Sequence, residues 1–316
     1  MKNKLLRKSV IVTGASSGIG KATVIKLIQS GYQVFGLARR YDKLVNLFSS
    51  ESVSKENKKE DFYIPIEFDI TKPETFNNVL DVIISTTANE NTVYGLVNNA
   101  GYVEPGAIED ISMNNLRSQF ETNFFGLVGF TKKVLPLMMI RRNEKEEEGG
   151  EGGEGGGRIV NVSSFAGLIS LPLIGAYSAT KFALEAVSDA LRIEVWNKNI
   201  KIITINPGVI ETDIYNVLKT RIDDLINNNN NSSSNSNNNN GYSRFIEAYN
   251  KYFIKTNYNG LKSSVVADVI CHSISSPNPK QKYIIGSTKE KIAIKLRPFI
   301  PDKLLSSLIA KQIHHE

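Results

Sequence analysis

The sequence predicts an α/β protein built on a doubly wound, mostly parallel sheet with helices on both faces. Short runs of β-branched and aromatic residues alternate with longer stretches of helical character, and those short runs are almost continuously apolar. A strand with one wet face would alternate apolar and polar residues, so these strands are expected to be buried on both faces. The expected strands are SVIVTG, YQVFGLA, FYIPIEFD, VYGLVNNAG, RIVNVSS, IKIITINPG and KYIIG.

Two low-complexity segments interrupt this alternation. Residues 143–157 are rich in Gly and Glu, and residues 227–240 consist of Asn and Ser. Neither composition buries enough apolar surface to offset the entropy lost on ordering, so both are expected to be flexible inserts. They are either tolerated surface expansions or partner-binding segments. Strand and helix patterns resume after each insert, so residues 1–316 are expected to form a single domain.

The composition limits the classes of protein to which this chain can belong. No run of about 18 apolar residues predicts a transmembrane helix, and the N-terminus does not resemble a secretory signal. Cys271 is the single cysteine, so no internal disulfide is possible and a cytoplasmic location is expected. The net charge of +6 suits an anionic cofactor or an acidic membrane surface. Without zinc-type spacing or an aromatic-interleaved basic run, neither nucleic acid nor a metal is expected.

The first expected strand leads into a glycine-rich turn, TGASSGIG, followed by a helix. Residues without side chains let backbone N–H groups and a helix N-terminus approach a pyrophosphate, where the helix dipole favours negative charge. A tight turn alone would also explain the glycines, but the flanking strand and helix favour a dinucleotide site. The two serines are expected to donate to phosphates or to cap the helix. The candidate cofactor-binding residues are Gly14, Ser16, Ser17, Gly18, Ile19 and Gly20.

The second expected strand ends at Arg39 and Arg40. An NAD(H) site carries an acid near this place for the ribose hydroxyls. Guanidinium groups instead match a 2′-phosphate, so the pair favours NADP(H) over NAD(H). The alternative is a pair of solvated arginines at the start of a helix.

Five motifs occur in order along the chain: the glycine turn, NNAG at 98–101, NVSS at 161–164, YSATK at 177–181 and NPGVIET at 206–212. Together they resemble the short-chain dehydrogenase/reductase family, from about residue 8 to residue 286 apart from the inserts. The resemblance implies a Rossmann fold and an NAD(P)-dependent oxidoreductase that acts on CH–OH groups. By analogy it also implies a homodimer or homotetramer.

The candidate residues converge on one edge of the expected sheet. In open α/β sheets the ligand lies beyond the carboxyl ends of the strands. The residues expected at such ends are Gly14, Arg39, Asp69, Asn98, Ser164 and Pro207.

Tyr177 and Lys181 lie four residues apart near the start of an expected helix, so they share a face. A free tyrosine has a pKa of about 10, and a nearby ammonium and the positive nicotinamide of the oxidised cofactor would lower it. Tyr177 is then the expected general acid in carbonyl reduction and general base in alcohol oxidation. Ser164 is expected to orient the substrate oxygen. The family spacing favours Ser164 over Ser163, whose side chain should point to the other face of the strand.

The resemblance implies further roles. Asn123, inside an expected helix at 112–141, would hold a water that links Lys181 to solvent. Asp69 would lie near the adenine, or else cap the next helix. Asn98 ends the fourth strand, and Gly101 lets the backbone pass close to the cofactor.

The segment after the sixth expected strand also matches the family. Pro207, Ile210 and Thr212 resemble the residues that hold the nicotinamide carboxamide. A plain turn is the alternative.

The chain between Ser164 and Tyr177, FAGLISLPLIGA, is almost wholly apolar. If these side chains face the crevice, the substrate is a hydrophobic alcohol or carbonyl, such as a steroid, a retinoid or a lipid-derived ketone, rather than a sugar. Alternatively they pack the core or a subunit contact. Residues 211–263 are the expected lid, and their sequence gives little further information on the substrate.

The C-terminal stretch 291–313 mixes Leu and Ile with Lys and Arg at helical spacing. It is expected to dock on the protein body or on a subunit partner, or else to contact a membrane peripherally.

Three functional classes fit these patterns. An active reductase or dehydrogenase is favoured because every catalytic position of the family pattern is filled. The rivals are a non-catalytic NADP(H)-sensing binding protein and a dehydratase or isomerase on the same fold.

Overall fold

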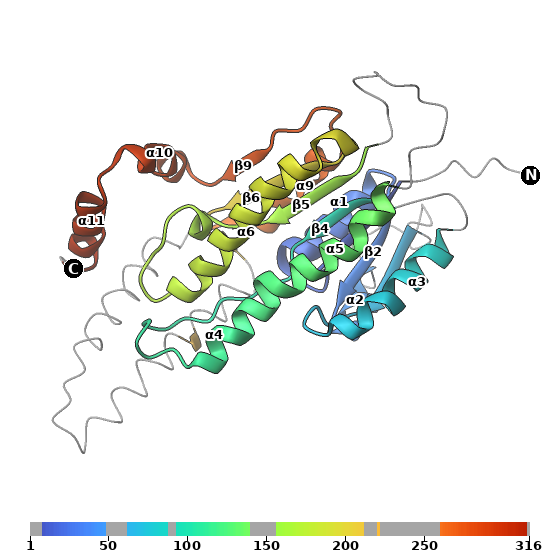
Figure 1. Ribbon diagram of the computed structural model, residues 1–316, viewed down its shortest axis with the longest axis horizontal. Coiled ribbons are helices and arrows are strands. Elements are labelled where there is room, and N and C mark those ends of the chain that lie inside the picture. The colour runs from blue at the N-terminus through green and yellow to red at the C-terminus, as the bar shows by residue number, and fades with distance from the viewer. Residues whose placement is uncertain are drawn as a thin grey trace, which may run out of the picture.

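The computed structural model describes residues 8–48, 62–87, 93–139, 156–211, 220–221 and 260–314. Its centre is a seven-stranded sheet in the order β3-β2-β1-β4-β5-β6-β9 (Figure 1), in which every pairing is parallel. All seven expected runs contribute to it, so the prediction of a doubly wound Rossmann-like fold is confirmed. The strands are β1 (Ser9–Thr13), β2 (Gln33–Ala38), β3 (Tyr63–Glu67), β4 (Val93–Asn98), β5 (Arg158–Val162), β6 (Lys201–Pro207) and β9 (Lys282–Ile285).

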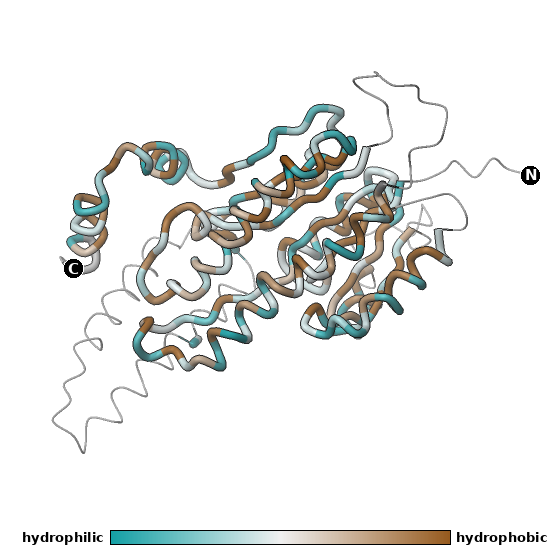
Figure 2. The backbone as a smooth tube through the Cα atoms, in the orientation of Figure 1, coloured by the Kyte–Doolittle hydropathy of each residue, from teal (hydrophilic) through white to brown (hydrophobic). Residues whose placement is uncertain are grey.

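Side chains on the two faces of each strand enter two different cores, as the pleat requires. Along β1, Val10 and Val12 enter one core, and Ile11 enters the other. Figure 2 shows the hydrophobic residues concentrated along the strands and on the helix faces that meet them. Burial on both faces explains why these strands are apolar throughout.

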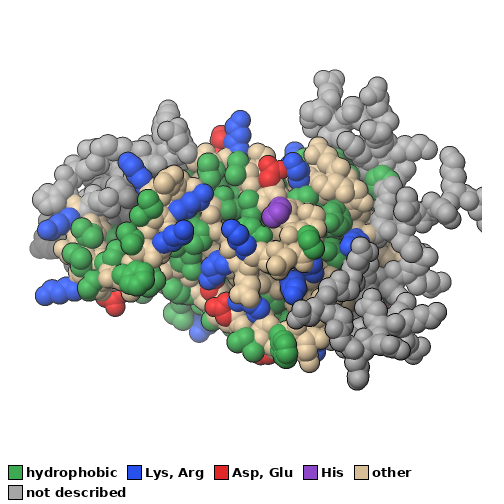
Figure 3. Space-filling model, turned by 90° about the horizontal axis from the view of Figure 1, so that it is seen from above, with side chains coloured by type: hydrophobic (Ala, Val, Ile, Leu, Met, Phe, Trp, Pro, Cys, Tyr) green, Lys and Arg blue, Asp and Glu red, His purple; other side chains and the backbone are tan. Residues whose placement is uncertain are grey.

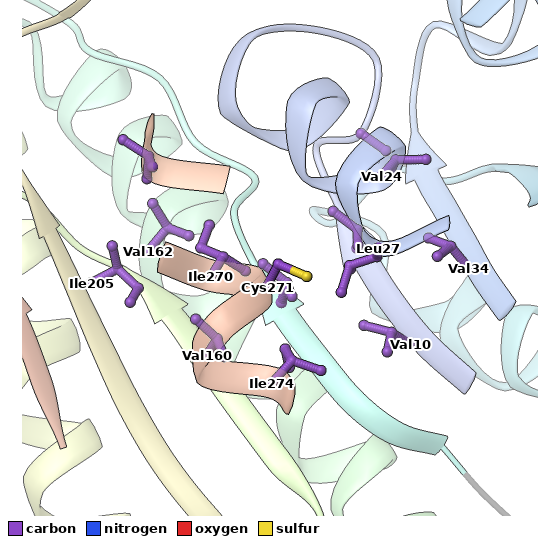
Figure 4. Close-up of a cluster of buried hydrophobic side chains, with 14 of the residues drawn as sticks. Val10, Val24, Leu27, Val34, Val160, Val162, Ile205, Ile270, Cys271 and Ile274 are labelled. Atoms are coloured by element: carbon purple, nitrogen blue, oxygen red, sulfur yellow. The ribbon is translucent and has the colours of Figure 1, made fainter. Parts of the chain in front are cut away.

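One core lies between the sheet and the helices α1 (Gly18–Gln29) and α9 (Ser263–Ser275). In Figure 4, Val10 and Val160 of the sheet lie near Leu27 of α1 and Ile274 of α9. The other core lies under α3 (Phe76–Thr86), α5 (Gly126–Met139) and α6 (Gly175–Glu194). The helices therefore cover both faces of the sheet, as predicted.

The helix expected at 112–141 is built from two segments. α4 (Met113–Phe120) begins at Ser112, whose side chain accepts from the Asn115 amide at 3.1 Å. One turn of π-helix, Glu121–Phe125, then joins α4 to α5. A π-turn inserts an extra residue into a helix and often marks a functional position.

The remaining described helices and strands lie outside the main sheet. β2 leads to α2 (Tyr41–Val45), and β7 (Ile210–Glu211) pairs with β8 (Leu261–Lys262) in a separate two-stranded sheet. The chain ends in α10 (Thr288–Leu296) and α11 (Asp302–His314). None of the helices in the described ranges has the length and apolar content needed to cross a bilayer.

Of the two expected inserts, residues 143–155 and 227–240 lie outside the described part of the chain. Only the end of the first is described: Gly156 and Gly157 lead into β5 and are buried. An added Cβ on Gly156 would lie 2.1 Å from the Asn199 carbonyl oxygen, so no larger residue fits there without backbone movement.

Candidate active site

The glycine turn lies at the end of β1, where the order of the strands in the sheet reverses between β1 and β4. Ligands usually bind in the crevice at this point of such folds. Gly14 and Gly18 have φ of 66° and 51°, a region that favours glycine. An added Cβ on Gly20 would lie 2.2 Å from the Gly14 carbonyl oxygen. The backbone therefore closes tightly around the N-terminus of α1 and leaves no room for a side chain at position 20.

The N-terminus of α1 suits an anion. Ser17 is its N-cap residue, but the Ser17 side chain makes no capping hydrogen bond. The first N–H groups of a helix have no partner within the helix, so a phosphate can accept from them. This donor set and the glycine cradle fit the pyrophosphate of a dinucleotide.

Two residues that we did not predict hold the glycine turn in place. The Asn99 side-chain amide donates to the carbonyl oxygens of Thr13 (3.0 Å) and Gly14 (3.2 Å). In return, the Thr13 hydroxyl accepts from the backbone amides of Asn99 (3.0 Å) and Ala100 (3.1 Å). These bonds clamp the end of β1 to the end of β4. Thr13 and Asn99 belong to the quoted motifs, but sequence does not show where a side chain points.

The two arginines after β2 have different surroundings. Arg40 Nη2 donates to the hydroxyls of Ser16 (3.1 Å) and Ser17 (2.9 Å), so its guanidinium lies against the glycine turn. The Arg39 side chain is exposed, and its positive charge acts on Asp69. Arg40 therefore contacts the glycine turn, although both arginine side chains are exposed and α2 begins directly after them.

Asp69 follows β3 and caps a turn rather than a helix. Its Oδ1 accepts from the Thr71 amide (3.0 Å) and hydroxyl (2.8 Å). Burial opposes ionisation, but the hydrogen bonds from Thr71 and the charges of Arg39 and Lys72 outweigh it, so the pKa of Asp69 is lowered. The carboxylate lies on the same side of the sheet edge as the arginines.

Asn98 directs its side chain into the protein interior. Its Nδ2 donates to the Thr131 hydroxyl and to Asn161 Oδ1, both at 2.8 Å, and Asn161 in turn donates to the Ser188 hydroxyl at 2.8 Å. This buried network joins β4 to β5, α5 and α6. Any contact of Asn98 with a cofactor would come from its backbone.

Ser164 and Tyr177 meet beyond the end of β5. The Ser164 side chain lies close enough to the Tyr177 hydroxyl to lower its pKa, and its hydroxyl accepts from the Ala166 amide at 3.1 Å. Burial outweighs this effect and raises the pKa of Tyr177 to about 12, opposite to the lowering that we expected from a nearby ammonium, because burial disfavours the charged phenolate. The neighbouring Ser163 is turned away and buried against Gly167, where an added Cβ would lie 2.8 Å from its hydroxyl.

Lys181 lies one helical turn after Tyr177 and is only 4% exposed. Its Nζ donates to the Val162 carbonyl oxygen at 2.8 Å and lies 5.7 Å from the centre of the Tyr177 ring. Burial lowers the pKa of Lys181 to about 8, while the charge of Glu185 acts in the opposite direction. The ammonium is therefore close to its titration point near neutral pH.

Asn123 lies in the π-turn and is fully buried. Its Oδ1 accepts from the Tyr102 amide at 3.0 Å, and its Nδ2 donates to the Tyr102 carbonyl oxygen at 2.8 Å. An added Cβ on Gly101 would lie 3.1 Å from Asn123 Oδ1 and 3.9 Å from Lys181 Nζ. Asn123 and Lys181 therefore border the same small space at Gly101.

The segment after β6 is partly described. Pro207 ends β6, and Ile210 is buried at the start of β7. Thr212 lies outside the described residues, and so does most of the expected lid.

The side chains of the apolar segment between Ser164 and Tyr177 are buried to different extents. Ala166, Leu173 and Ile174 are buried, and Leu173 has a φ of 60°, which is strained for a residue with a side chain. The other large apolar side chains are only half-buried, so they remain available to a ligand: Phe165, Leu168, Ile169, Leu171 and Pro172.

Within the described ranges, no group of three or more His, Cys, Asp or Glu residues is placed to hold a metal ion.

Comparison with known proteins gives a consistent result. Residues 8–223 match the family described as short chain dehydrogenase. The chain is 31% identical over 310 residues to the uncharacterized oxidoreductase YbbO of Escherichia coli, covering 98% of this chain and 96% of that protein. It is 28% identical to the NADPH-dependent 3-dehydrocapnine reductase of Ornithobacterium rhinotracheale, covering 96% of each chain. A short-chain dehydrogenase from Streptomyces avermitilis has a similar structure, with a TM-score of 0.70, 25% identity and coverage of 97% and 96%.

Proposed function

The chain belongs to the short-chain dehydrogenase family and is an oxidoreductase of that family, and we propose that it interconverts a hydrophobic ketone or aldehyde and its alcohol with NADP(H). The observation that carries the proposal is the placement of the Ser164 side chain next to the Tyr177 hydroxyl, with the buried Lys181 beside the tyrosine ring. These groups provide a proton donor, a hydroxyl that can orient a substrate oxygen and a cation that can tune the donor.

The residues around the glycine turn support NADP(H) as the preferred cofactor. The cradle of Gly14, Gly18 and Gly20 and the N-terminus of α1 would hold the pyrophosphate. Arg40, next to Ser16 and Ser17, would pair with a 2′-phosphate, and Asp69 would lie near the adenine. The Ornithobacterium relative is named as NADPH-dependent, which agrees with this preference.

When bound, the cofactor donates a hydride to the carbonyl carbon or accepts one from the alcohol. In reduction, Tyr177 gives its hydroxyl proton to the substrate oxygen, and in oxidation it takes that proton back. Ser164 holds the substrate oxygen beside Tyr177. The Lys181 ammonium would stabilise the tyrosinate left after proton transfer.

Asn123 completes the proposed proton route. Its side chain lies beside Lys181 at Gly101 and would hold a water that connects the lysine to solvent. The same role in the family is the basis for this assignment. Pro207, Ile210 and Thr212 are proposed to hold the nicotinamide carboxamide.

A hydrophobic substrate fits the half-buried apolar side chains between Ser164 and Tyr177. Comparable turnover of small polar carbonyls, with none of long-chain or ring ketones, would exclude this class.

The first experiment is oxidation of NADPH and NADH by the wild type and Tyr177→Phe, with aromatic, steroid and aliphatic carbonyls. We expect wild-type turnover with a preference for NADPH. Tyr177→Phe should bind NADPH and be inactive, since it lacks only the phenolic hydroxyl group that exchanges the proton. If both proteins bind NADPH and neither reduces a carbonyl nor oxidises an alcohol, a non-catalytic NADP(H)-sensing protein is the better explanation. Conversion of substrate without net change in cofactor absorbance would indicate a dehydratase or isomerase.

We also propose a homodimer or homotetramer. Large apolar side chains remain exposed around α5 and α6: Phe125 (53% exposed) in the π-turn before α5, Phe182 (44%) on α6 and Trp196 (79%) just after α6. Their burial against a second copy would remove apolar area from water. The cytoplasmic location, the single domain over residues 1–316 and peripheral membrane contact through 291–313 stay predictions.

A further inference from the structure

The last two helices form an arm, residues 288–314, that extends away from the sheet and its covering helices (Figure 1). No residue of α10 is buried. Phe299, in the turn between the two helices, is 82% exposed, and large apolar side chains on both helices are about half exposed. These side chains are Ile292, Leu296, Leu304 and Leu308. A contiguous apolar surface of this kind usually has a partner.

The charge on the arm is positive. Its two acids already have partners, because Glu290 forms a capping box with Ser287 and Asp302 pairs with Arg297 at 2.7 Å. Figure 3 shows hydrophobic side chains at this end of the molecule with Lys and Arg around them. The lysines of the arm are all exposed: Lys289, Lys291, Lys295, Lys303 and Lys311.

We propose that this arm binds the surface of an anionic phospholipid bilayer. Lysine is depleted from the centres of protein interfaces, where its charge would lose water. On a bilayer, the lysine stems can lie along the apolar layer while the amines meet lipid phosphates. The mixture of exposed leucine, isoleucine and phenylalanine with lysine therefore fits a membrane surface better than a second copy of the chain.

The arm also begins at the candidate active site. An added Cβ on Gly208, just after β6, would lie 2.9 Å from the Glu290 carboxylate and 3.0 Å from the Phe165 ring. A bilayer-bound arm would hold the substrate side of the crevice next to the lipid. This consequence, unlike the binding itself, rests on the proposed function with a hydrophobic substrate.

The test is cosedimentation of the full chain with vesicles of phosphatidylcholine alone and with added phosphatidylserine. We expect binding to the anionic vesicles only. Replacing Lys291, Lys295 and Lys303 by Gln should weaken it about 100-fold, at roughly fivefold per lysine. Phe299→Ser should weaken it by removing the apolar anchor. Lys132→Gln with Lys133→Gln, two exposed lysines on α5, is the charge control and should bind like the wild type.

Equal binding to both vesicle types would overturn the proposal, and so would no binding to either. Loss of a dimer in Phe299→Ser, without vesicle binding by the wild type, would assign the arm to a second copy instead. Vesicle binding needs neither cofactor nor substrate, so it is separable from the proposed reaction. The arm variants should still oxidise NADPH with a small water-soluble ketone if the wild type does.

A different observation concerns Glu185, a buried carboxylate one helical turn after Lys181. It is 6% exposed, and ionised groups are rarely buried without partners. Its Oε1 accepts from Asn206 Nδ2 at 2.6 Å, and its Oε2 pairs with Lys282 Nζ of β9 at 2.7 Å. The same Asn206 Nδ2 donates to the Ser164 carbonyl oxygen at 3.2 Å.

We infer that Glu185 is a positioning residue that couples the charge of Lys181 to the backbone of Ser164. Through Asn206 it ties the serine to β6, and through Lys282 it ties α6 to the edge strand. The charged groups that act on it or contact it are Lys181 on its own helix and Lys282 on β9, whereas β6 contributes the neutral Asn206.

The test is a pH titration of Lys181 in the protein without cofactor. NMR of lysine labelled with ¹³C at Cε monitors the titration, and the Lys181 signal is identified as the one missing from Lys181→Met. Burial places the pKa of Lys181 at about 8, and the negative charge of Glu185 supports the ammonium. Glu185→Gln keeps the shape but not the charge, so the titration should move down by roughly one pH unit. Glu185→Asp keeps the charge and should stay near the wild type.

Asp189→Asn is the matched control, since it removes an exposed carboxylate one turn further along α6, paired with Arg192. It should leave the Lys181 titration unchanged. If Glu185→Gln does not fold, Lys282→Gln tests the same coupling by removing the partner of Glu185. The Glu185 carboxylate should then act more strongly on Lys181 and raise the pKa of Lys181. No movement in a folded Glu185→Gln or Lys282→Gln would overturn the inference. The titration requires no turnover, so its result does not depend on the proposed reaction.

Discussion

At the scale of single residues, the site combines groups whose pKa values are shifted by their surroundings. Burial makes Tyr177 a poorer acid and Lys181 a poorer base than they are in water. A tyrosine with a raised pKa stays protonated at neutral pH, and a lysine with a lowered pKa can exchange a proton near neutral pH. Perturbed groups of this kind cluster at functional sites.

The buried Lys181 is expected to cost stability. Its folded pKa of about 8 lies below its unfolded value, so the unfolded chain binds the proton more tightly. The associated penalty is present at pH 7 and disappears as the pH rises through 8 towards the unfolded pKa. Lys181→Met should therefore gain up to about 3 kcal/mol of unfolding free energy over the wild type at pH 7, less what the lost bond to Val162 costs.

Urea unfolding of both proteins between pH 6.5 and 10.5 measures this difference. The advantage of Lys181→Met should shrink as the pH rises, while its catalytic activity is lost at every pH. A stability difference that grew with pH would contradict the assignment of a lowered pKa.

Arg40 is expected to decide the choice of cofactor. A charge-assisted hydrogen bond contributes about 1.5–3 kcal/mol, so Arg40→Ser should weaken NADPH binding by roughly 10- to 100-fold. NADH, which lacks the 2′-phosphate, should bind nearly as before. Quenching of protein fluorescence gives both dissociation constants, and Lys43→Ser, an exposed lysine on α2, is the control. Equal weakening of NADPH and NADH would assign Arg40 to loop structure alone.

At the scale of elements, short segments place the functional groups. The glycine turn brings the N-terminus of α1 to the end of β1, and the π-turn rotates Asn123 into the interior. In α6, the four-residue spacing places Tyr177 and Lys181 on the face that meets β5.

Glycine is required at position 20 by this packing. Gly20→Ala would place a methyl group 2.2 Å from the Gly14 carbonyl oxygen, so the turn would have to open. We expect lower thermal stability and loss of NADPH binding. Gly129→Ala in α5 is the control: its added Cβ would lie 3.4 Å from the Phe76 ring, and alanine favours helix by about 0.5–1 kcal/mol. Retained NADPH binding in Gly20→Ala would show that the cradle is not needed.

At the scale of the whole molecule, one parallel sheet brings the carboxyl ends of β1 to β6 to the same side. Two exposed surfaces lie outside the sheet. One is the face of α5 and α6, and the other is the C-terminal arm. Each has large apolar side chains in water, but only the arm combines them with a dense set of lysines.

The face of α5 and α6 is expected to join subunits. Phe182→Glu with Trp196→Glu would bring two charges into the contact, which costs several kcal/mol if they are desolvated without partners. Light scattering after gel filtration should show a dimer or tetramer for the wild type and a smaller species for the double variant. Leu304→Glu, on the arm, should leave the assembly unchanged. A monomeric wild type would remove the subunit assignment.

Sequence by itself determined the elements and the motif positions. The runs that became β1 to β6 and β9 in the main sheet are short, apolar and β-branched, and this local pattern reflects burial on both faces. The spacing within YSATK places Tyr177 and Lys181 on one helix face whatever the rest of the chain does. The glycine turn is readable for the same reason, because left-handed backbone selects glycine locally.

Only the tertiary structure decided which side chains meet. Asn98 and Asn99 are adjacent in the sequence, yet one enters a buried network and the other clamps the glycine turn. Arg40, rather than Arg39, reaches the serines, and Glu185 meets Lys282 about a hundred residues away. Such contacts depend on the order of strands in the sheet and on side-chain direction at element ends. Local sequence pattern carries neither, because non-local contacts form only when the whole sheet is assembled.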